Sequence, residues 1–319
     1  MTNYDVFNGD ADGICSLIQL RHAEPREAQL VSGVKRNINL LSGISVSEGD
    51  RLTVLDISLD KNLKEVQEAL VNKAEVFYVD HHYSGDIPDD PNLTTIINEA
   101  PDICTSLLIN GHLSGQFPEW AVTGAFGDNL KQSARALGKT LNLAASDVDA
   151  LEALGIYINY NGYGSSLEDL HFAPTDLYLK LCGFSNPLEF YHSNNADFAR
   201  LEEGYRSDMH FAKEVEAMYR NDNVAVFILP NEPWARRVSG VYSNDLTNAF
   251  PDRAHGVLTK KENGHFLVSV RAPLNNKQGA VDLCRQFPTG GGRAAAAGIN
   301  DLPAAELENF IAKLSKSYG

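Results

Sequence analysis

The chain has 319 residues, 43% of them apolar, and its 42 acidic and 27 basic residues give a formal charge of −15. This length is roughly twice that of a typical domain, so we expect two domains with buried cores. The negative charge argues against a protein that coats long nucleic acids, because such proteins present a basic surface that releases counterions. Small anionic substrates are compatible with it, since bound divalent cations invert the field where acidic side chains converge.

The start of the chain is acidic and polar, without the basic and apolar segments of a secretory signal. Apolar runs also stay well short of the roughly 18 residues that span a bilayer. We therefore expect a cytoplasmic protein without a membrane partner. The cysteines are scattered without a C-x-x-C pair, which predicts buried thiols rather than disulfides or a zinc site: Cys15, Cys104, Cys182 and Cys284.

The first 130 residues alternate strand-like runs with helical periodicity. Four segments have the pattern of strands: 4–7 (YDVF), 28–33 (AQLVSG), 52–57 (LTVLDI) and 76–80 (VFYVD). Between the last two, residues 61–74 place Leu63, Val66 and Leu70 on one helical stripe. A strand, a helix and a strand within about 30 residues form a βαβ unit, which predicts an α/β fold with a parallel sheet.

The second half of the chain is first helical and then strand-rich. Residues 146–158 and 187–220 have helical patterns, strands are predicted at 223–229, 254–261 and 265–273, and a Gly-rich turn precedes a last helix near 303–317. The predicted organisation is a parallel-sheet domain over 1–191, a helical connector over 192–222 and a smaller α/β domain over 223–319.

Carboxylates follow the first strands, together with two histidines: Asp10 and Asp12, then Asp56, then Asp80 with His81 and His82. In open parallel sheets the ligand crevice lies outside the carboxyl ends of the strands, so we expect these side chains to converge. A further candidate is Asp128, in the segment GAFGDN, where Gly124 and Gly127 would let the backbone approach such a centre.

A converged acidic cluster calls for cations. Without them the carboxylate pKa values would rise and the fold would lose stability, whereas two divalent ions about 3.5–4 Å apart would use the carboxylates as bridging and terminal ligands. Mixed Asp and His ligation favours two Mn²⁺ ions, with Mg²⁺ as a substitute. Singly, Asp10 and Asp12 could instead satisfy backbone amides in a turn, and the histidines could lie in a solvated loop. The joint occurrence favours metal binding.

The motifs resemble, in order, those of a known family. Four of them are similar to the motifs of the DHH phosphoesterase superfamily: DADG at 10–13, VLDIS at 54–58, VDHHYSG at 79–85 and GAFGDN at 124–129. The segment TGGGRAAAAGIN at 289–300 resembles the glycine-rich signature of the DHH-associated C-terminal domain (DHHA1), so the resemblance spans nearly the whole chain. It implies a metal-dependent phosphoesterase with a catalytic and a substrate-binding domain.

The resemblance also implies a role for each matching residue. Asp56 would bridge two ions and Asp10 would hold the first. The second ion would be held by Asp12, His81 and Asp128. Asp80 would orient His81, as carboxylates often fix a metal-bound imidazole, and His82 would face the substrate phosphate. A hydroxide bridging the two ions would then attack phosphorus in line with the leaving oxygen.

Two positions depart from the family pattern. Val6 stands where many members have a histidine, four residues before the first motif aspartate, so the first ion lacks a ligand. Asn8 offers an amide oxygen for a metal or a water there, as in the RecJ-like branch. Arg293 replaces the usual histidine of the C-terminal signature; its guanidinium can bind phosphate but cannot donate a proton in catalysis.

Further substrate contacts are expected in the second domain. The run Gly290, Gly291 and Gly292 would expose backbone N–H groups that can bind an anion, and Arg271 follows a predicted strand, where it could clamp a phosphate. The alternatives are a plain turn for the glycines and a solvated charge for the arginine.

Two segments of the first domain are weaker candidates. Lys35 and Arg36 could meet a phosphate at the crevice, or form a solvated pair in a loop. The segment 159–164 (NYNGYG) is predicted as a glycine-rich loop whose Tyr160 and Asn161 could stack on and hydrogen-bond a base. Its alternative is an aromatic loop that packs on its own domain.

The leading functional hypothesis is a Mn²⁺-dependent phosphodiesterase of oligoribonuclease type, which cleaves short linear nucleotides such as pGpG to mononucleotides. A RecJ-like single-strand exonuclease would be expected to add an oligonucleotide-binding domain and a basic channel, so long nucleic acid is not the expected substrate. Hydrolysis of pyrophosphate or polyphosphate is an alternative, and a non-catalytic nucleotide-binding module is an alternative of another class. Base preference, cleavage polarity and oligomeric state, a dimer among the options, do not follow from the sequence.

Overall fold

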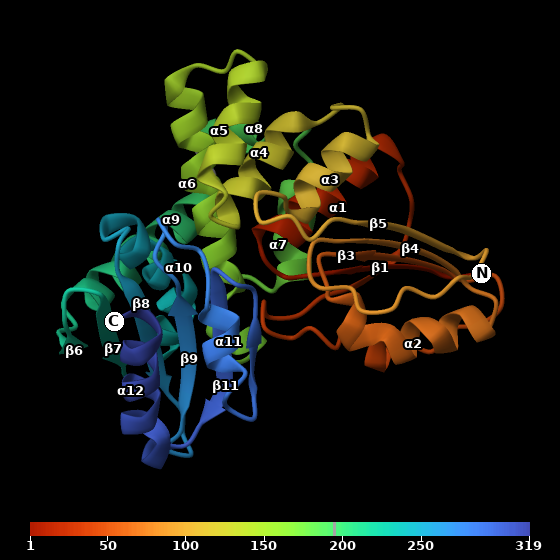
Figure 1. Cartoon of the computed structure of the whole chain (residues 1–319). Coiled ribbons are helices and arrows are strands. Elements are labelled where there is room, and N and C mark those ends of the chain that lie inside the picture. The colour runs from red at the N-terminus through yellow and green to blue at the C-terminus, as the bar shows by residue number, and fades with distance from the viewer. Residues whose placement is uncertain (194–195) are drawn as a thin grey trace. The chain divides into compact units, whose positions relative to one another are not determined.

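The computed structural model describes residues 1–193 and 196–319 (Figure 1). It divides into two compact units, Met1–Glu202 and Glu203–Gly319, and the division falls within one helix, α9. Among the described residues, none of the helices combines the length and apolar character needed to cross a bilayer.

The first unit contains a five-stranded parallel sheet with the strand order β2-β1-β3-β4-β5 (Figure 1). The strands are β1 (Asn3–Phe7), β2 (Gln29–Val31), β3 (Arg51–Leu55), β4 (Glu75–Asp80) and β5 (Leu93–Ile97). The predicted α/β fold with a parallel sheet is confirmed, although β5 was not predicted.

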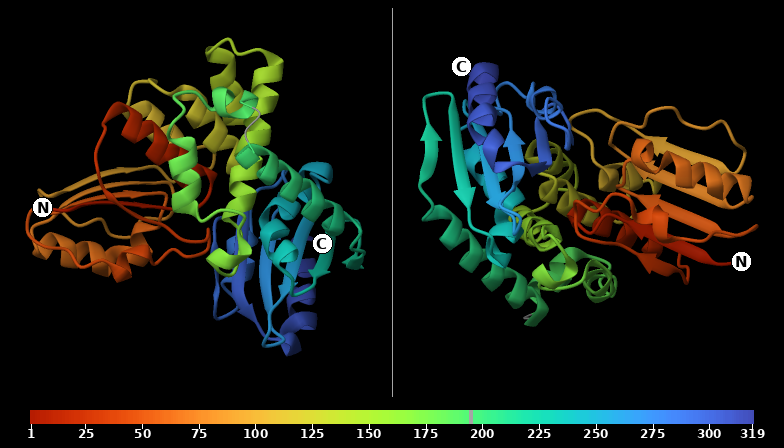
Figure 2. Two further views of the ribbon diagram at one scale, coloured as in Figure 1. Left: turned by 180° about the vertical axis from the view of Figure 1, so that it is seen from behind. Right: turned by 90° about the horizontal axis from the view of Figure 1, so that it is seen from below.

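Helices cover both faces of this sheet (Figure 1; Figure 2). On one face, Val66 and Leu70 of α2 (Leu59–Val71) join an apolar cluster with Leu52 and Val54 of β3. On the other face, α1 (Ala11–Ala23) contacts β1 and α3 (Thr105–His112) contacts β4. The remaining helices of the unit are η1 (Leu40–Gly43), α4 (Pro118–Gly127), α5 (Lys131–Thr140), α6 (Ala145–Gly162), η2 (Leu167–Asp169), α7 (Pro174–Leu181) and α8 (Pro187–His192).

Two glycines let α4 pack closely against its neighbours. A Cβ atom at Gly127 would lie 2.3 Å from Cβ of Ala11 in α1 and 2.9 Å from the carbonyl oxygen of Gly155 in α6. At Gly124 it would lie 2.4 Å from Oγ of Ser106 in α3. These distances leave no room for a side chain, so the glycines bring the end of α4 close to α1, α3 and α6.

The second unit contains a mixed six-stranded sheet with the order β10-β11-β9-β8-β7-β6. The strands are β6 (Ala217–Arg220), β7 (Val224–Leu229), β8 (Ala254–Lys260), β9 (Phe266–Arg271), β10 (Gly290–Gly292) and β11 (Ala296–Leu302). Only the β7–β8 pair is parallel among the pairings described. The helices are the C-terminal part of α9 (Ala196–Lys213), then α10 (Pro233–Ala249), α11 (Ala280–Cys284), η3 (Ala304–Glu306) and α12 (Leu307–Tyr318). This mixed sheet confirms the predicted α/β character of the second half.

The predicted helix over 187–220 needs correction, whereas the predicted connector over 192–222 stays a prediction. Helix α9 ends at Lys213, and Ala217–Arg220 form strand β6, which pairs antiparallel with β7. Tyr219 packs against the apolar cluster of the second unit, and this tertiary contact overrides the helix-forming composition of the segment. Residues 194–195 of the predicted connector lie outside the described residues.

The four cysteines are free thiols. Cys15, Cys104 and Cys284 are buried, as predicted, whereas Cys182 is half-buried. Burial raises the pKa values of Cys15 and Cys104 well above the ordinary value for a thiol, and the neighbouring Asp12 carboxylate acts in the same direction. These two thiols are therefore protonated and unreactive at neutral pH.

The buried His255 in β8 predicts a pH-dependent stability. Neither ring nitrogen has a hydrogen-bond partner among the described residues, and burial, with a smaller effect of Arg253, lowers its pKa from 6.5 to about 4. As the pH falls, His255 therefore becomes protonated near pH 6.5 in the unfolded chain but only near pH 4 in the folded chain. The stabilising effect is fully present above pH 6.5 and is lost as the pH falls through this window.

We expect the protonation of His255 to lower the free energy of unfolding by about 3 kcal/mol between pH 7 and pH 4. Urea unfolding at a series of pH values measures it, and the His255→Leu variant serves as the reference because it keeps the other titrating groups. The difference between the two pH profiles isolates His255, and parallel profiles would contradict the prediction.

Candidate metal centre

The predicted acidic residues lie at the carboxyl ends of neighbouring strands. Asp10 caps the N-terminus of α1 directly after β1, Asp56 follows β3, and Asp80 is the last residue of β4. Because β1, β3 and β4 are adjacent and parallel, the three side chains start from one edge of the sheet. Asp128 joins them from the C-terminal end of α4.

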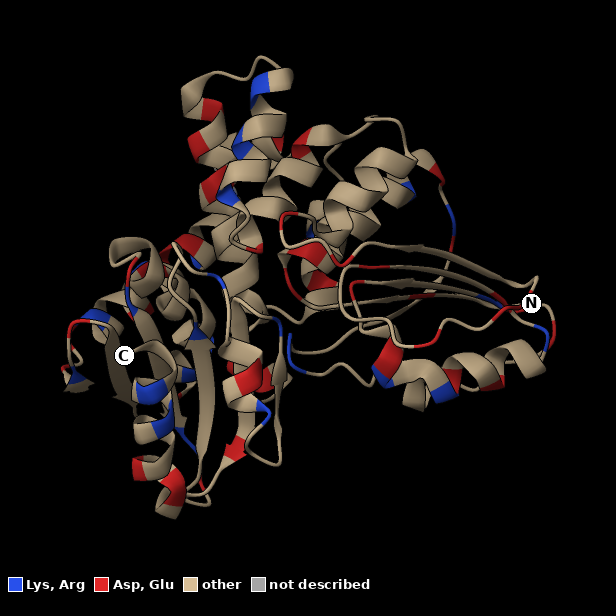
Figure 3. Cartoon of the chain, viewed as in Figure 1, with Lys and Arg blue, Asp and Glu red and all other residues tan. Residues whose placement is uncertain are grey.

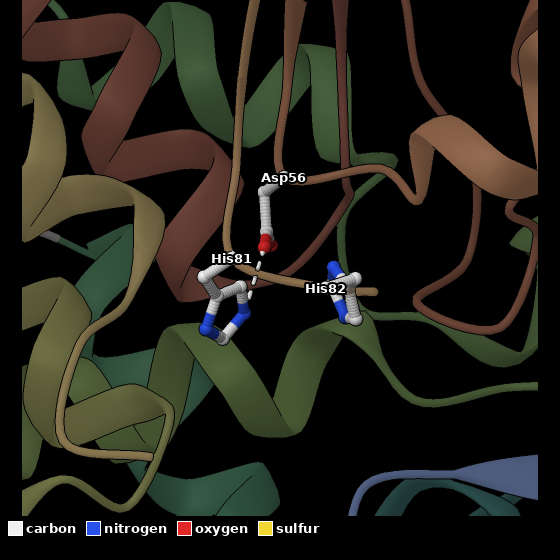
Figure 4. A group of neighbouring side chains, drawn as sticks. All are labelled: Asp56, His81 and His82. Carbon is white, nitrogen blue, oxygen red and sulfur yellow. Dashed lines mark ion pairs between the residues drawn. The ribbon is translucent and has the colours of Figure 1, made fainter. Parts of the chain in front are cut away.

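Three carboxylates surround the Nε2 atom of His81. This atom lies 3.3 Å from an oxygen of Asp56 and 3.9 Å from oxygens of both Asp12 and Asp128. Asp56 and His81 point toward each other, and His82 lies beside them (Figure 4). One ligand atom from each of these three residues lies within 4.8 Å of the others. The structure thus brings together the residues predicted to hold the second ion and the one predicted to bridge.

The cluster is buried, and its charges need compensation. Asp12, Asp56 and His81 are at most 3% exposed. Burial, reinforced by the neighbouring Asp12 and Asp10 carboxylates, raises the pKa of Asp56 well above its ordinary value. A divalent cation among these oxygens would reverse that effect, and three carboxylates with one imidazole form a donor set that suits Mn²⁺. The residues therefore fit a metal ion.

Backbone amides at the start of α3 hold Asp12 in place. Its two carboxylate oxygens accept hydrogen bonds from the N–H groups of Thr105, at 2.7 Å, and Ser106, at 2.8 Å. The hydroxyl of Thr105 also donates to Asp56 over 3.2 Å. Thr105 and Ser106 were not predicted from the sequence. Their signal is a Thr-Ser pair at the start of a helix, where unpaired N–H groups attract carboxylates.

Asp56 has a left-handed backbone conformation, with φ of 60°. Its N–H group donates to the carbonyl oxygen of Val79 on the neighbouring strand, which fixes the turn. Asn129, directly after Asp128, is also left-handed, with φ of 61°. Such conformations cost of order 1–3 kcal/mol each and cluster at functional sites, where they aim side chains that regular structure would direct elsewhere.

Asp10 combines two interactions. Its Oδ1 accepts hydrogen bonds from the N–H groups of Asp12 and Gly13, at 3.0 and 3.1 Å, so the alternative of a helix-capping aspartate is correct for this oxygen. Its Oδ2 lies 2.5 Å from Nζ of Lys35. Burial would raise the pKa of Asp10, but the charge and hydrogen bond of Lys35 together with the N–H group of Gly13 outweigh it, and the pKa lies below its ordinary value.

Lys35 lies inside the cluster and not in a solvated loop. Besides Asp10, its Nζ donates to Oδ1 of Asn159 at 2.9 Å and lies 3.7 Å from Asp128. Burial lowers its pKa, but Asp10, Tyr163 and Asp128 together more than offset this, and the pKa lies well above its usual value. The side chain is therefore a permanent cation. The neighbouring Arg36 is half-buried.

The expected pairing of Asp80 with His81 is wrong. Oδ1 of the fully buried Asp80 lies 2.6 Å from Nδ1 of His82, whereas Nδ1 of His81 lies 2.9 Å from the carbonyl oxygen of Ile103. A carbonyl oxygen can only accept, so Nδ1 of His81 donates this hydrogen bond, and Nε2 is the ring nitrogen that faces the carboxylates. The carbonyl group of Ile103 thus orients the ring of His81, and Asp80 orients His82, whose side chain is 33% exposed.

Asn8 contributes an unsatisfied buried oxygen. The residue is 5% exposed, and its Oδ1 has no hydrogen-bond partner among the described residues. Its Nδ2 donates weakly, at 3.4 Å, to the backbone oxygen of Lys35. A buried carbonyl oxygen of this kind can be satisfied by a water, a substrate donor or a cation, so the role of Asn8 stays a prediction.

Most of the segment NYNGYG is helical and not the predicted loop. Residues 159–162 form the last turn of α6, and Tyr160 and Asn161 are fully buried. The Tyr160 hydroxyl lies 2.8 Å from Nε2 of His171, and Asn161 Oδ1 accepts hydrogen bonds from the N–H groups of His171 and Phe172. The alternative, packing on its own domain, is correct. Asn159, in the same segment, accepts a hydrogen bond from Nζ of Lys35.

The remaining candidates lie in the second unit. Arg271 ends β9, and its Nε donates to Oδ1 of Asn244 in α10 at 2.7 Å. The predicted glycine turn is a short strand, β10, in which Gly290 donates its N–H group to the carbonyl oxygen of Phe287. Gly292, with φ of 135°, ends this strand before Arg293. Their role toward a substrate stays a prediction.

Comparison with solved structures defines the class of the fold. The chain aligns over 99% of its length with RecJ from Thermus thermophilus, solved with Mn²⁺, at a TM-score of 0.58 and 16% identity, and covers 51% of that chain. It thus spans about half of that RecJ. A pGpG-specific phosphodiesterase, PggH from Vibrio cholerae, aligns with a TM-score of 0.57 and 16% identity, over 99% of this chain and all of its own.

A third solved structure, the DHH domain of a protein assigned to a family of ribosomal proteins, aligns with a TM-score of 0.63 and 13% identity, over 99% of this chain and 86% of that one. No protein-family model and no curated protein sequence matches the chain. The chain shares the fold of these RecJ, PggH and DHH-domain structures, and the predicted resemblance is confirmed at the level of the fold.

Proposed function

We propose that the protein is a metal-dependent phosphodiesterase that hydrolyses short linear nucleotides, such as pGpG, to mononucleotides. The observation that carries this proposal is the convergence of Asp12, Asp56 and Asp128 on Nε2 of His81, at the carboxyl end of a parallel sheet. A buried acidic cluster with an imidazole has little structural value of its own, and it fits a cation that acts on phosphate.

The residues of the centre would divide the work. Asp12, Asp56, His81 and Asp128 would hold Mn²⁺, or Mg²⁺ in its place. When bound, such an ion supplies Lewis-acid chemistry, which polarises a phosphoryl oxygen and lowers the pKa of water. Nδ1 of His82 is hydrogen-bonded to Asp80, so the Nε2 atom of this partly exposed ring would be available to contact a substrate phosphate.

Several features support a short nucleotide as the substrate. PggH, whose chain is aligned over its full length, is specific for pGpG. The formal charge of −15 disfavours long nucleic acid. On α2, basic residues are interspersed with acidic ones and form ion pairs, such as Lys64 with Glu68, so this helix offers no basic stripe (Figure 3). Arg271, Arg293 and the glycines of β10 would be able to bind a phosphate by their own chemistry.

The test is a hydrolysis assay with Mn²⁺ that compares pGpG, longer 5′-phosphorylated single strands and pyrophosphate, with products resolved by chromatography. We expect GMP from pGpG at the highest kcat/KM, and loss of turnover in His81→Ala, which excludes a contaminating enzyme. Exclusive release of phosphate from pyrophosphate, or a preference for long strands as in an exonuclease, would replace the proposed substrate. Nucleotide binding without turnover would identify a binding module instead.

A further inference from the structure

The acidic cluster already contains one cation, the ammonium group of Lys35. Its Nζ lies 2.5 Å from Oδ2 of Asp10, 2.9 Å from Oδ1 of Asn159 and 3.7 Å from Oδ1 of Asp128. These acceptors are two carboxylates and an amide oxygen, which are the ligands that hard divalent cations use in proteins. Lys35 therefore occupies a position built for a positive charge.

The surrounding structure holds Lys35 at both ends. Its backbone N–H group donates to the carbonyl oxygen of Gly162 over 2.8 Å, which ties the loop to the end of α6. Its Nζ lies 5.3 Å from the ring centre of Tyr163, a distance at which an aromatic face attracts a cation. With Asn159, the last turn of α6 and the residue after it thus contribute three contacts that fix this ammonium group beside Asp10.

We propose that Lys35 takes the place of one metal ion, so that the centre combines a single divalent cation, bound by Asp12, Asp56, His81 and Asp128, with a fixed ammonium group. The inference rests on the proposed function for the presence of the metal ion, and it changes the number of ions expected from the sequence from two to one. Asp10 then forms an ion pair with Lys35 and does not bind a metal ion.

The geometry and the charges both favour this arrangement. An ion bound to Oδ2 of Asp10 would lie about 2 Å from that oxygen, in the space that the Lys35 nitrogen fills. The two cations would also repel each other strongly at such a distance. Val6, which is fully buried in the apolar cluster of the sheet, offers no ligand atom that could favour the ion over the lysine.

The number of bound ions tests the proposal directly. Equilibrium dialysis against Mn²⁺, followed by metal analysis, is expected to give one ion per chain for the wild type. Its electron paramagnetic resonance spectrum should be that of an isolated Mn²⁺. In Lys35→Ala a second ion is expected to bind at Asp10, with two ions per chain and the exchange coupling of ions about 3.5–4 Å apart. Lys35→Arg, which keeps the charge, should retain one ion.

A second variant keeps the proposal falsifiable where Lys35→Ala does not fold. Asp10→Asn preserves the oxygen that caps α1, and it should bind one Mn²⁺ with an affinity within about threefold of the wild type, because Asp10 does not contact the ion. Two coupled ions in the wild type, a single ion in folded Lys35→Ala, or loss of Mn²⁺ binding in Asp10→Asn would each overturn the inference.

Hydrolysis is scored separately from metal content. Turnover of pGpG by a wild type that holds two coupled ions would overturn this inference and leave the proposed function standing. One bound ion without turnover of any nucleotide would support the inference that Lys35 replaces a metal ion, and it would overturn the proposed function. A chain that binds no Mn²⁺ would overturn both.

Discussion

The Asp56→Asn variant is expected to hydrolyse pGpG at least about 1,000-fold more slowly than the wild type and to bind Mn²⁺ at least about a hundredfold more weakly. Asp56 Oδ1 lies 3.3 Å from Nε2 of His81, so its charge is central to the donor set. Asparagine keeps the shape of the side chain and tolerates the left-handed backbone, which separates the loss of charge from a loss of structure. Steady-state kinetics and calorimetric titration with Mn²⁺ measure the two effects.

Asp149→Asn is the matched control for this variant. Asp149 lies in α6, its side chain is 72% exposed, and its ion pair with Arg135 is long, at 3.8 Å. The same chemical change should therefore leave kcat/KM and Mn²⁺ affinity unaltered. Retention of more than a tenth of the wild-type kcat/KM by Asp56→Asn would contradict the assigned metal centre.

The Asp5→Ala variant is expected to lose about 3–5 kcal/mol of unfolding free energy. Asp5 and Arg21 form a buried ion pair in which Nε and Nη2 of Arg21 donate to the two carboxylate oxygens, at 2.7 and 2.5 Å. The two side chains are 2% and 7% exposed, so removal of Asp5 leaves a guanidinium charge buried, with Thr53 as its remaining side-chain partner among the described residues. Urea unfolding at neutral pH measures the loss.

Two further variants define what this loss means. Glu75→Ala removes the exposed partner of Arg51 on the same sheet and should cost less than about 1 kcal/mol. The double variant Asp5→Leu/Arg21→Met replaces the buried pair by apolar side chains and should recover most of the stability. A cost for Asp5→Ala as small as that for Glu75→Ala would show that water reaches the buried pair.

The acidic half of the centre could be predicted because it follows from the topology. Parallel strands end at one edge of a sheet, so Asp56 and Asp80 had to lie near Asp10 once the βαβ pattern was recognised. The two histidines directly after Asp80 were predicted to lie near the same edge for the same reason. Side chains at the ends of regular elements are the part of a site that periodicity can locate.

The position of Lys35 could not be predicted in the same way. It lies in an irregular segment between β2 and η1, where no periodic pattern tells which side chain turns inward. The pairing of His82 with Asp80 could not be predicted for a related reason. Two adjacent histidines follow Asp80, and only the backbone after β4 decides that His82 returns to this carboxylate while His81 reaches Ile103.

The two wrongly predicted segments show how tertiary packing overrides local preference. Asparagine and glycine are poor helix formers, so 159–162 was predicted as a loop, yet the burial of Tyr160 and the hydrogen bonds of Asn161 keep the helix intact. Conversely, residues 217–220 contain helix formers but pair with β7 at the edge of the second sheet. Both outcomes depend on partners that are remote in sequence.

The left-handed turn at position 56 has an evolutionary consequence. Glycine would relax that backbone but supplies no oxygen, glutamate would keep the charge on a longer side chain that prefers other conformations, and β-branched residues would be strained. Few single-nucleotide changes at this position can therefore keep both the turn and the carboxylate that the proposed metal site needs.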